Sequence, residues 1–335
     1  MNIAKLETIL KAEPGFRLKQ AMEAIYKQLM TDWSQALNFP QKLRKKLNKE
    51  CPLEIKAQVL ESRDKKTIKA QITLSDGLKI ETVLLRHKDR NTVCVSSQVG
   101  CALGCLFCAT GQQGFKRNLL VWEIVEQVIF FARYLKEIGD RVDNLVFMGM
   151  GEPFLNYDNV LEAIKLLNSK DTLNLGARHI SISTIGIIPG MQKLAKEKLQ
   201  INLAISLHAS DDYLRTKIIP VNKKYYLKNL IDAVGDYLKI TKRQVMFEYI
   251  MIERFNDSME QAMELADLLK HLPKHLYIIN LIQYNPTKGF NPSSELAIKN
   301  FKAILDREGI KTTIRLRLGR EVKGACGQLV ADLEK

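Results

Sequence analysis

Hydrophobic and polar residues alternate with two different periods along the chain, and the period changes near residue 90. Residues 1–50 repeat apolar side chains at helical spacing, as in the segment from Phe16 to Leu29. Between residues 53 and 86 the period shortens to two and is interrupted by the turn pair Asp76-Gly77. The pattern predicts a small α+β domain over residues 1–90, with helices followed by an antiparallel sheet.

From residue 91 onward, short apolar runs alternate with longer amphipathic segments. The runs predict strands near residues 92–97, 144–150, 179–186, 202–208, 245–252 and 276–285, each followed by an amphipathic segment that predicts a helix. Six βα units in series predict a parallel sheet with right-handed crossovers. Because a full barrel needs eight units, we expect an open, partial (β/α)6 barrel over residues 91–318. Residues 319–335 then form a C-terminal tail.

Polar residues and glycines gather where these predicted strands end. In parallel α/β folds, ligands bind at the carboxyl ends of the strands. Glycine lets the backbone approach a ligand closely, and a carboxylate accepts hydrogen bonds from an ammonium group. Each feature alone is common in strand-to-helix turns, but together they predict a cofactor pocket lined by Gly151, Glu152, Ser183, Ser206, Leu207, His208 and Asn285.

The composition is that of a soluble globular protein, with 46% hydrophobic and 26% charged residues. The N-terminus lacks the apolar core of a signal peptide, and the most apolar helical segment, residues 123–135, is too short and too charged to span a bilayer. We therefore expect a cytoplasmic protein without a membrane anchor, whose thiols stay reduced. Clustered cysteines in such a protein indicate metal binding or redox chemistry rather than disulfides.

The charge distribution favours a polyanionic partner. The net charge is +14, and residues 1–90 contain 19 Lys and Arg against 11 Asp and Glu. Such an excess is typical of nucleic-acid binding, although a solvated basic surface gives the same count. The basic segment at residues 41–49, together with Arg315 and Arg317 on one face of a strand leading to the tail, supplies candidate phosphate contacts.

Four of the six cysteines lie within fifteen consecutive positions. Cys101, Cys105 and Cys108 form a C-x3-C-x2-C group in the loop after the first predicted barrel strand. A structural zinc ion takes four ligands, usually from two separate pairs. A [4Fe–4S] cluster held by three thiolates instead leaves one iron open to a small ligand. The spacing favours the cluster, with a zinc site or buried thiols as alternatives.

This cysteine group, with the aromatic Phe107 before its last member, resembles the signature of the radical S-adenosylmethionine (SAM) enzymes. Over essentially the whole chain the sequence resembles the RlmN-type radical SAM RNA methyltransferases, through the segments CVSSQVGCALGCLFCATGQQGFKRNL, GMGEP, GARHISISTIGIIPG, LAISLHASDD, IPVNKKY and ACGQL. The resemblance implies methylation of C2 of an adenine in 23S rRNA and in tRNA. It also implies a [4Fe–4S] cluster on Cys101, Cys105 and Cys108, and two SAM molecules per turnover.

The resemblance also assigns roles to residues outside the cluster motif. Cys326 matches the cysteine that carries the methyl group, and Cys94 matches the cysteine that resolves the protein–RNA intermediate by forming a disulfide. Glu81 matches a carboxylate that accepts a proton. The tail departs from the family pattern at Lys323 and Gly324, where an acidic residue and an alanine are usual.

Two other functions compete with C2 methylation at this point. A related resistance enzyme methylates C8 of the same rRNA adenine, and the motifs do not separate the two reactions. A non-catalytic iron–sulfur RNA-binding sensor would also need the cluster cysteines, but it has no use for Cys94 and Cys326. For the enzyme we expect a monomer that receives electrons from a carrier such as flavodoxin or ferredoxin. Cys51 matches no motif and is interpreted as structural.

Overall fold

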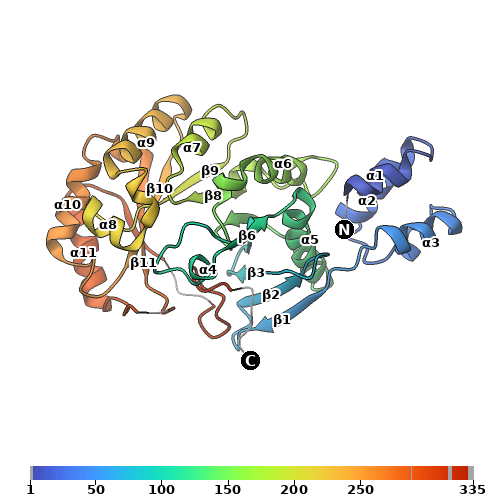
Figure 1. Cartoon of the computed structure of the whole chain (residues 1–335), viewed down its shortest axis with the longest axis horizontal. Helices are drawn as coiled ribbons and strands as arrows, with labels where there is room; N and C mark the ends of the chain where they lie inside the picture. The colour runs from blue at the N-terminus through green and yellow to red at the C-terminus, as the bar shows by residue number, and fades with distance from the viewer. Residues whose placement is uncertain (1–2, 288, 316–318, 331–335) are drawn as a thin grey trace.

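A single ten-stranded sheet organises the molecule in the computed structural model, which describes residues 3–287, 289–315 and 319–330 (Figure 1). The strands lie in chain order across the sheet. The two strands that follow β4 in the chain form a separate two-stranded sheet. They are β1 (Ala57–Glu61), β2 (Thr67–Thr73), β3 (Lys79–Arg86), β4 (Asn91–Cys94), β7 (Asn144–Phe147), β8 (Ile180–Thr184), β9 (Asn202–Ser206), β10 (Val245–Met251), β11 (Tyr277–Gln283) and β12 (Thr312–Ile314).

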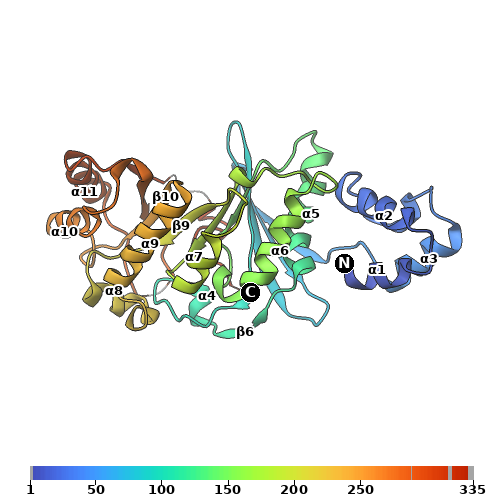
Figure 2. The same ribbon diagram turned by 90° about the horizontal axis from the view of Figure 1, so that it is seen from above.

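The strands from β4 to β12 are parallel and curve into an incomplete barrel. All six predicted barrel strands are present, and β12 adds a further parallel strand beside β11. Among the described residues β1 and β12 remain the two edges of the sheet, so the barrel is open, as predicted. Helices cover its outer face (Figure 2): α5 (Val121–Glu137), α6 (Tyr157–Asn168), α7 (Ile188–Leu194), α8 (Asp212–Ile218), α9 (Leu227–Thr241), α10 (Met259–Leu269) and α11 (Glu295–Arg307).

The antiparallel strands predicted before residue 90 belong to the same sheet. β3 pairs antiparallel with β4, which places Val83 opposite Cys94, and β4 then pairs parallel with β7. The change of pattern near residue 90 is therefore a change from antiparallel to parallel pairing within one sheet. Because of this continuity, residues of β3 lie directly beside the first barrel strand.

Three helices precede the sheet and lie to one side of the barrel (Figure 1). They are α1 (Ile3–Leu10), α2 (Phe16–Tyr26) and α3 (Gln41–Glu50), and the fully buried Trp33 lies between them in the short helix η1 (Trp33–Gln35). Arg133 and Lys136 of α5 donate hydrogen bonds to backbone carbonyls of this N-terminal segment, at Leu53, Met30 and Gln28. No described helix combines the length and apolar character needed to cross a membrane.

A short hairpin after β4 carries the cysteine-rich loop. β5 (Gln98–Gly100) pairs with β6 (Phe115–Asn118), and the loop between them contains the one-turn helix α4 (Ala109–Gln112). Gly100 has a φ of +74°, and a Cβ at this position would come within 1.9 Å of the Gly114 carbonyl oxygen. Only glycine therefore allows the loop to close this tightly. The remaining short helices are η2 (Pro153–Asn156), η3 (Ala177–His179), η4 (Pro220–Lys223) and η5 (Lys274–Leu276).

Candidate active site

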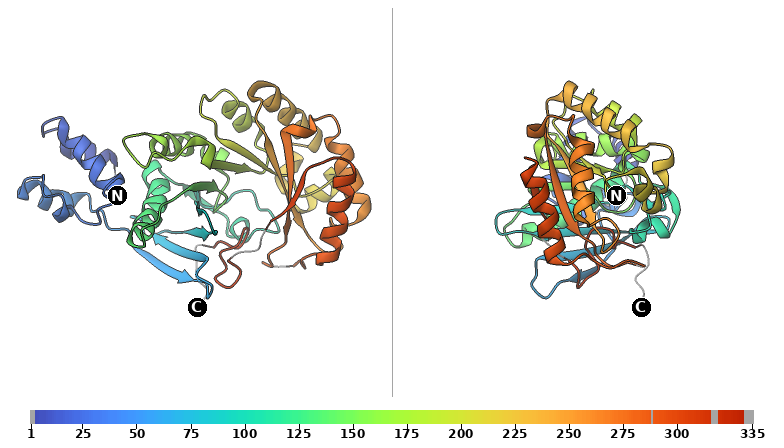
Figure 3. Two further views of the ribbon diagram at one scale, coloured as in Figure 1. Left: turned by 180° about the vertical axis from the view of Figure 1, so that it is seen from behind. Right: turned by 90° about the vertical axis from the view of Figure 1, so that its left-hand side faces the viewer.

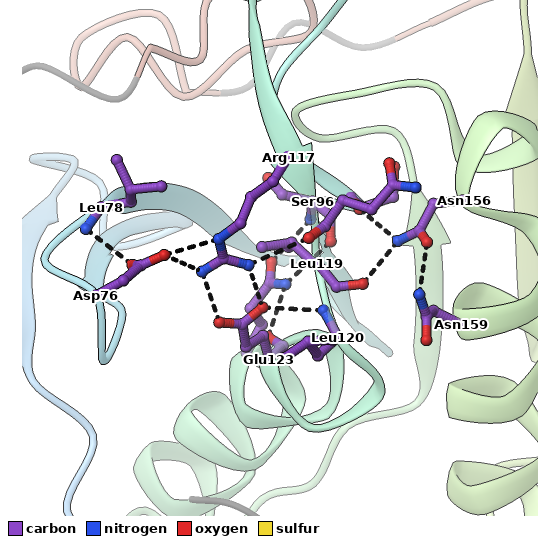
Figure 4. Close-up of polar contacts among 12 residues, drawn as sticks. Asp76, Leu78, Ser96, Arg117, Leu119, Leu120, Glu123, Asn156 and Asn159 are labelled. Atoms are coloured by element: carbon purple, nitrogen blue, oxygen red, sulfur yellow. Dashed lines mark hydrogen bonds and ion pairs between the residues drawn. The ribbon is translucent and has the colours of Figure 1, made fainter.

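A charged and amide-rich network fixes the base of the cysteine loop (Figure 4). Arg117 of β6 makes a bidentate ion pair with Glu123, at 2.7 and 2.8 Å, and its Nε donates to Asp76 at 2.7 Å. Asn156 donates to the carbonyls of Ser97 and Leu119, both at 2.8 Å. Bidentate Arg–carboxylate pairs hold a defined geometry. The network therefore joins the loop to α5 and to the β2–β3 turn, a connection that no motif in the sequence predicts.

The three cysteines of the loop line one cavity of about 130 Å³. Cys101 and Cys105 are buried and Cys108 is half-buried. Burial raises the pKa of all three thiols, that of Cys101 to about 12, whereas the nearby Arg215 acts in the opposite direction on Cys105. Thiols in such a site stay protonated until a metal centre binds them as thiolates.

The donor set fits an iron–sulfur cluster better than a single metal ion. Within the described ranges, no three His, Cys, Asp or Glu side chains are grouped closely enough to hold one ion. A [4Fe–4S] cluster distributes its cysteine ligands over separate irons, so its ligands surround a larger volume than those of zinc. Three thiols around one cavity match that requirement.

Five of the residues predicted to bind the cofactor line the same cavity: Gly151, Glu152, Ser183, Ser206 and His208. Glu152 is buried, and its two carboxylate oxygens accept hydrogen bonds from the amides of Phe154 (3.0 Å) and Ile185 (2.9 Å). Burial raises the pKa of Glu152 to about 7. Each carboxylate oxygen keeps a second lone pair, so Glu152 retains the capacity to accept from a ligand.

The two serines and Gly151 shape the wall of this cavity. The hydroxyls of Ser183 and Ser206 lie 3.3 Å apart on neighbouring strands β8 and β9. Gly151 has a φ of +96°, and an added Cβ would approach Gln98 to 2.5 Å. A side chain at position 151 would therefore clash with Gln98 of β5, so this position requires glycine.

His208 is held in one orientation and one protonation state. Its φ is +63°, its Nδ1 accepts from the amide of Ile250 at 3.1 Å, and its ring packs edge-on against Phe107 with 4.8 Å between centroids. Burial, with the positive charge of Arg215, lowers the pKa of His208 to about 3. The neutral ring with an accepting Nδ1 carries its proton on Nε2, which makes His208 a hydrogen-bond donor.

Two of the predicted cofactor-binding residues have other positions. Leu207 is fully buried and does not line the cavity; its amide donates to Glu248 and its carbonyl accepts from Arg215. Because successive side chains of a strand point to opposite faces, Ser206 and His208 face the barrel interior and Leu207 faces outward. Asn285 lines a second cavity and donates to the Cys326 carbonyl at 3.3 Å.

The second cavity is larger, about 580 Å³, and is lined by Cys94 and Cys326, two of the three cysteines outside the cluster motif. Cys94, the last residue of β4, lines this cavity and is absent from the lining of the smaller one. Cys326 lines both cavities. The tail cysteine therefore lies at the junction between the cavity with the three clustered thiols and the cavity with Cys94.

Arg315 also lines both cavities, and its positive charge acts on the thiols of Cys94 and Cys326. The side chain enters the barrel, where it lies 3.5 Å from a Glu248 carboxylate oxygen and contacts the sulfur of Met148. Burial raises the pKa of Cys94 to about 12. The side chain of Cys326 is exposed, but the surrounding protein still raises its pKa by desolvation, and Arg315 opposes both shifts. The sequence predicts a phosphate contact for Arg315, but the structure turns it inward; Arg317 lies outside the described residues.

The C-terminal tail lies beside the cysteine loop (Figure 3) and is joined to it by hydrogen bonds from Ala109 and Thr110. The amide of Ala109 donates to the Gly327 carbonyl at 2.8 Å, and the Thr110 hydroxyl donates to the Leu329 carbonyl at 2.6 Å. Gly327 has a φ of +83°, a conformation that favours glycine. The tail thus brings Cys326 to the cavities although it is more than 200 residues from the loop in sequence.

Glu81 is fully buried beneath the tail and lines neither cavity. One carboxylate oxygen lies 2.8 Å from Lys69 Nζ, and the other accepts from the amide of Val330 at 2.9 Å. Burial raises the pKa of Glu81, and the ion pair with Lys69 opposes that shift. The predicted proton acceptor therefore contacts the tail in this conformation.

Two residues of the site carry no signal in the sequence. Arg215 is fully buried and donates to the carbonyls of Leu207, Ile185 and Ser206, which ties together the ends of β8 and β9. Glu248 lies in the smaller cavity and accepts from Asn280 at 2.9 Å. Burial lowers the pKa of Arg215 to about 10, yet at neutral pH it remains a cation near Cys105.

Comparisons with known proteins agree with this geometry. The profile of the radical SAM superfamily matches residues 95–266. A probable dual-specificity RNA methyltransferase RlmN from Dictyoglomus thermophilum is 46% identical, over 98% of this chain and 95% of its own length. The ribosomal RNA large subunit methyltransferase N of Nitrosopumilus maritimus is 44% identical, over 95% and 93%. The crystal structure of a radical SAM methyltransferase from Sphaerobacter thermophilus superposes with a TM-score of 0.94 at 42% identity, covering 99% of this chain and 98% of that one.

Proposed function

The chain belongs to the RlmN family of radical SAM RNA methyltransferases, and on that premise we propose that it methylates C2 of an adenine in 23S rRNA and in tRNA through a methyl group carried on Cys326. Membership implies SAM and a [4Fe–4S] cluster as cofactors. The thiols of Cys101, Cys105 and Cys108 would hold the cluster, and Glu152, Ser183, Ser206 and His208 would contact SAM. When bound, these cofactors supply an organic radical that removes a hydrogen atom from an unactivated carbon.

The acceptor explains why the reaction needs protein thiols. C2 of adenine lies between two ring nitrogens and is too electron-poor to attack the methyl group of SAM directly. We propose that Cys326 accepts a methyl group from one SAM molecule and that a second SAM is consumed in activating this S-methyl group. The activated carbon then bonds to C2, so that the RNA is joined to Cys326 through a thioether.

Release of the RNA requires Cys94 and a base. Attack of the Cys94 thiolate on the Cys326 sulfur forms the disulfide and breaks the bond between that sulfur and the carbon on C2. The former C2 hydrogen leaves as a proton, for which Glu81 is the proposed acceptor. The single electron left over from the radical addition would return to the [4Fe–4S] cluster, and the released carbon takes up a proton to complete the methyl group. The disulfide must then be reduced by an external thiol system before the next turnover.

One observation carries the proposal: Cys326 borders both cavities, the three clustered thiols border only the smaller one, and Cys94 borders only the larger one. This separation supports a division of labour. Cys326 can be methylated on the side of the clustered thiols and can meet the RNA and Cys94 on the other side. A non-catalytic sensor needs neither the second cavity nor the two additional thiols.

A trapping experiment tests the proposal. Cys94→Ala should join Cys326 to RNA but should not release it, which gives a slow-migrating species on a denaturing gel that ribonuclease removes. The double variant Cys94→Ala, Cys326→Ala should give no such species, and Cys51→Ala, which alters a buried thiol outside the site, should turn over normally. Release of free methylated RNA by Cys94→Ala would contradict the mechanism. Mass spectrometry of the adenosine formed by the wild type distinguishes C2 from C8 methylation.

The same function sets the cellular requirements. We propose that the protein acts as a monomer in the cytoplasm, on tRNA and on rRNA that is not yet assembled, because a base deep inside a finished ribosome is out of reach. A small electron carrier such as flavodoxin or ferredoxin would provide the electrons.

A further inference from the structure

The larger cavity extends from Cys326 to the opposite end of the barrel. Asn144 and Asn202 are the first residues of β7 and β9, and Arg178 and His179 immediately precede β8; all four line the cavity. These positions mark the amino ends of the parallel strands, whereas the clustered thiols lie at the carboxyl ends. The cavity therefore leads from the reacting cysteines to the face of the barrel that is remote from the cysteine loop.

This amino-end opening is positively charged and lacks compensating carboxylates. Arg90 and Arg178, both exposed, line the cavity together with His87 and His179, and no Asp or Glu is among its described lining residues. Arg243 shares an adjoining groove with Arg178. Burial and the charge of Arg178 both lower the pKa of Arg243, as expected for cations held close to each other. Cations gathered without carboxylates attract an anionic ligand.

Hydrogen bonds within the protein hold these cations in place. Arg178 donates through Nε to Gln200, and its carbonyl accepts from Asn202 at 2.8 Å. Arg243 donates to the Asn202 side chain at 3.4 Å. Among the described residues, the terminal guanidinium nitrogens of Arg178 have no hydrogen-bond partner, so they remain available to a ligand.

The cavity also has the size and polarity of a nucleotide site. Its volume of about 580 Å³ lies within the range of roughly 300–1,000 Å³ that is typical of ligand pockets. Asn144, Ser181 and Asn202 place amides and a hydroxyl on its wall, and such groups hydrogen-bond to base edges and ribose. Arginines and amides at the opening, followed by Ser181 and the two cysteines, form the order that a phosphate backbone with one inserted base would meet.

We propose that the target RNA strand approaches the barrel from the amino ends of the strands, that Arg90 and Arg178 bind its phosphates, and that one nucleotide passes through the larger cavity to Cys326 and Cys94. The inference rests on the proposed function, which supplies the RNA substrate, and adds the direction of approach and the residues that bind the backbone. RNA and SAM then occupy opposite sides of Cys326. The docked tail is hydrogen-bonded to the cysteine loop, and Cys326 and its tail neighbours line the larger cavity, whereas Arg90 and Arg178 line it from the amino ends of the strands.

The salt dependence of RNA binding tests this inference. Arg90→Gln, Arg178→Gln and the double variant are titrated with protein-free 23S rRNA at several salt concentrations. Each lost phosphate contact should reduce the slope of log K against log salt by roughly one. The matched control is Arg307→Gln, which removes an exposed arginine at the end of α11 and should keep the wild-type slope. Iron content and the unfolding midpoint verify that each variant is folded.

The outcomes separate this inference from the proposed function. If the double variant binds rRNA with the affinity and slope of the wild type, the amino-end approach is wrong, even when the wild type methylates C2. If Arg307→Gln weakens binding equally, the effect is general surface charge and the inference also fails. If the wild type methylates no RNA, but the double variant loses salt-dependent RNA binding and Arg307→Gln does not, the proposed RNA site is supported and the proposed methylation reaction is refuted.

Discussion

The amide of Val330 donates a hydrogen bond to Glu81, whose carboxylate is paired on its other side with Lys69. A residue of the C-terminal tail is thus hydrogen-bonded to the carboxylate that is proposed as the proton acceptor. Glu81 is fully buried in this arrangement and cannot reach a substrate in the larger cavity. The segment around Val330 therefore has to move away before Glu81 can accept a proton from RNA.

Glu81→Gln should separate loading of the tail from turnover on RNA. The glutamine oxygen can still accept from Val330, so the tail should dock and Cys326 should still acquire its methyl group, which peptide mass spectrometry detects. Loss of a general base typically costs 10²–10⁴ in rate, and we expect RNA methylation to fall by at least about 100-fold. An unmethylated Cys326 in this variant would instead show that Glu81 serves to dock the tail.

The colour of the protein should distinguish the three clustered cysteines from Cys94 and Cys326. Protein prepared without oxygen should be brown, with about four irons per chain, as expected for one [4Fe–4S] cluster. Replacement of Cys101, Cys105 or Cys108 by alanine should abolish the colour, because each thiol is proposed to anchor one iron of the cluster. Cys94→Ala and Cys326→Ala should retain it. A colourless wild type with one bound zinc ion would refute the cluster.

Arg315 should control the ionisation of both redox cysteines. A nearby cation favours the thiolate, so its removal raises the thiol pKa. In Arg315→Gln, alkylation of Cys94 and Cys326 should therefore require a higher pH than in the wild type, and Arg315→Lys should restore part of the difference. Peptide mass spectrometry after alkylation over a pH series measures both sites. Superimposable pH profiles for the wild type and Arg315→Gln would show that the arginine only packs against Met148 and Glu248.

Glu152 should make the cofactor-free chain less stable as pH rises. Its pKa of about 7 in the folded chain is above the ordinary glutamate value of 4.5, so the folded state favours the protonated carboxyl. The resulting contribution is fully present below pH 4.5 and is lost as pH rises through about 7. This contribution to the free energy of unfolding is about 3 kcal/mol, because one pKa unit corresponds to 1.36 kcal/mol.

The comparison with Glu152→Gln isolates this contribution. The variant cannot ionise at this position. The unfolding free energy of the wild type, relative to that of the variant, should therefore be lower at pH 8 than at pH 5. Urea unfolding at the two pH values provides the measurement. Parallel behaviour of the two proteins would mean that Glu152 ionises as readily in the folded chain as in the unfolded one.

Local patterns in the sequence were sufficient for the barrel but not for its interior contacts. The six strands and their helices follow from hydrophobic period, and Cys101, Cys105 and Cys108 share a cavity because they share one loop. Strand β12 is only three residues long, so its pairing with β11 could not be read from periodicity. The strand-end pattern groups Leu207 with the cofactor-binding residues. The alternation of side chains along a strand instead directs Leu207 away from the barrel interior.

The contacts that sequence reasoning missed all join distant segments. Arg215 binds carbonyls at the ends of two other strands, and Glu81 meets Val330 across 249 positions. Neither partner changes the local pattern of its own segment. A buried arginine reads like any other helical arginine, and the strand residue Glu81 reads like a surface charge, until the fold places them beside their partners.

The continuous sheet has a consequence for the choice of substrate. β3 and β4 are hydrogen-bonded neighbours, and Arg133 and Lys136 attach the N-terminal helices to α5, so the basic helix α3 and Cys326 belong to one framework. We therefore expect a nucleic acid that contacts α3 and also delivers a base to Cys326 to bridge a separation set by this framework. RNAs of unrelated sequence would meet this requirement equally when their folded shapes span the same distance.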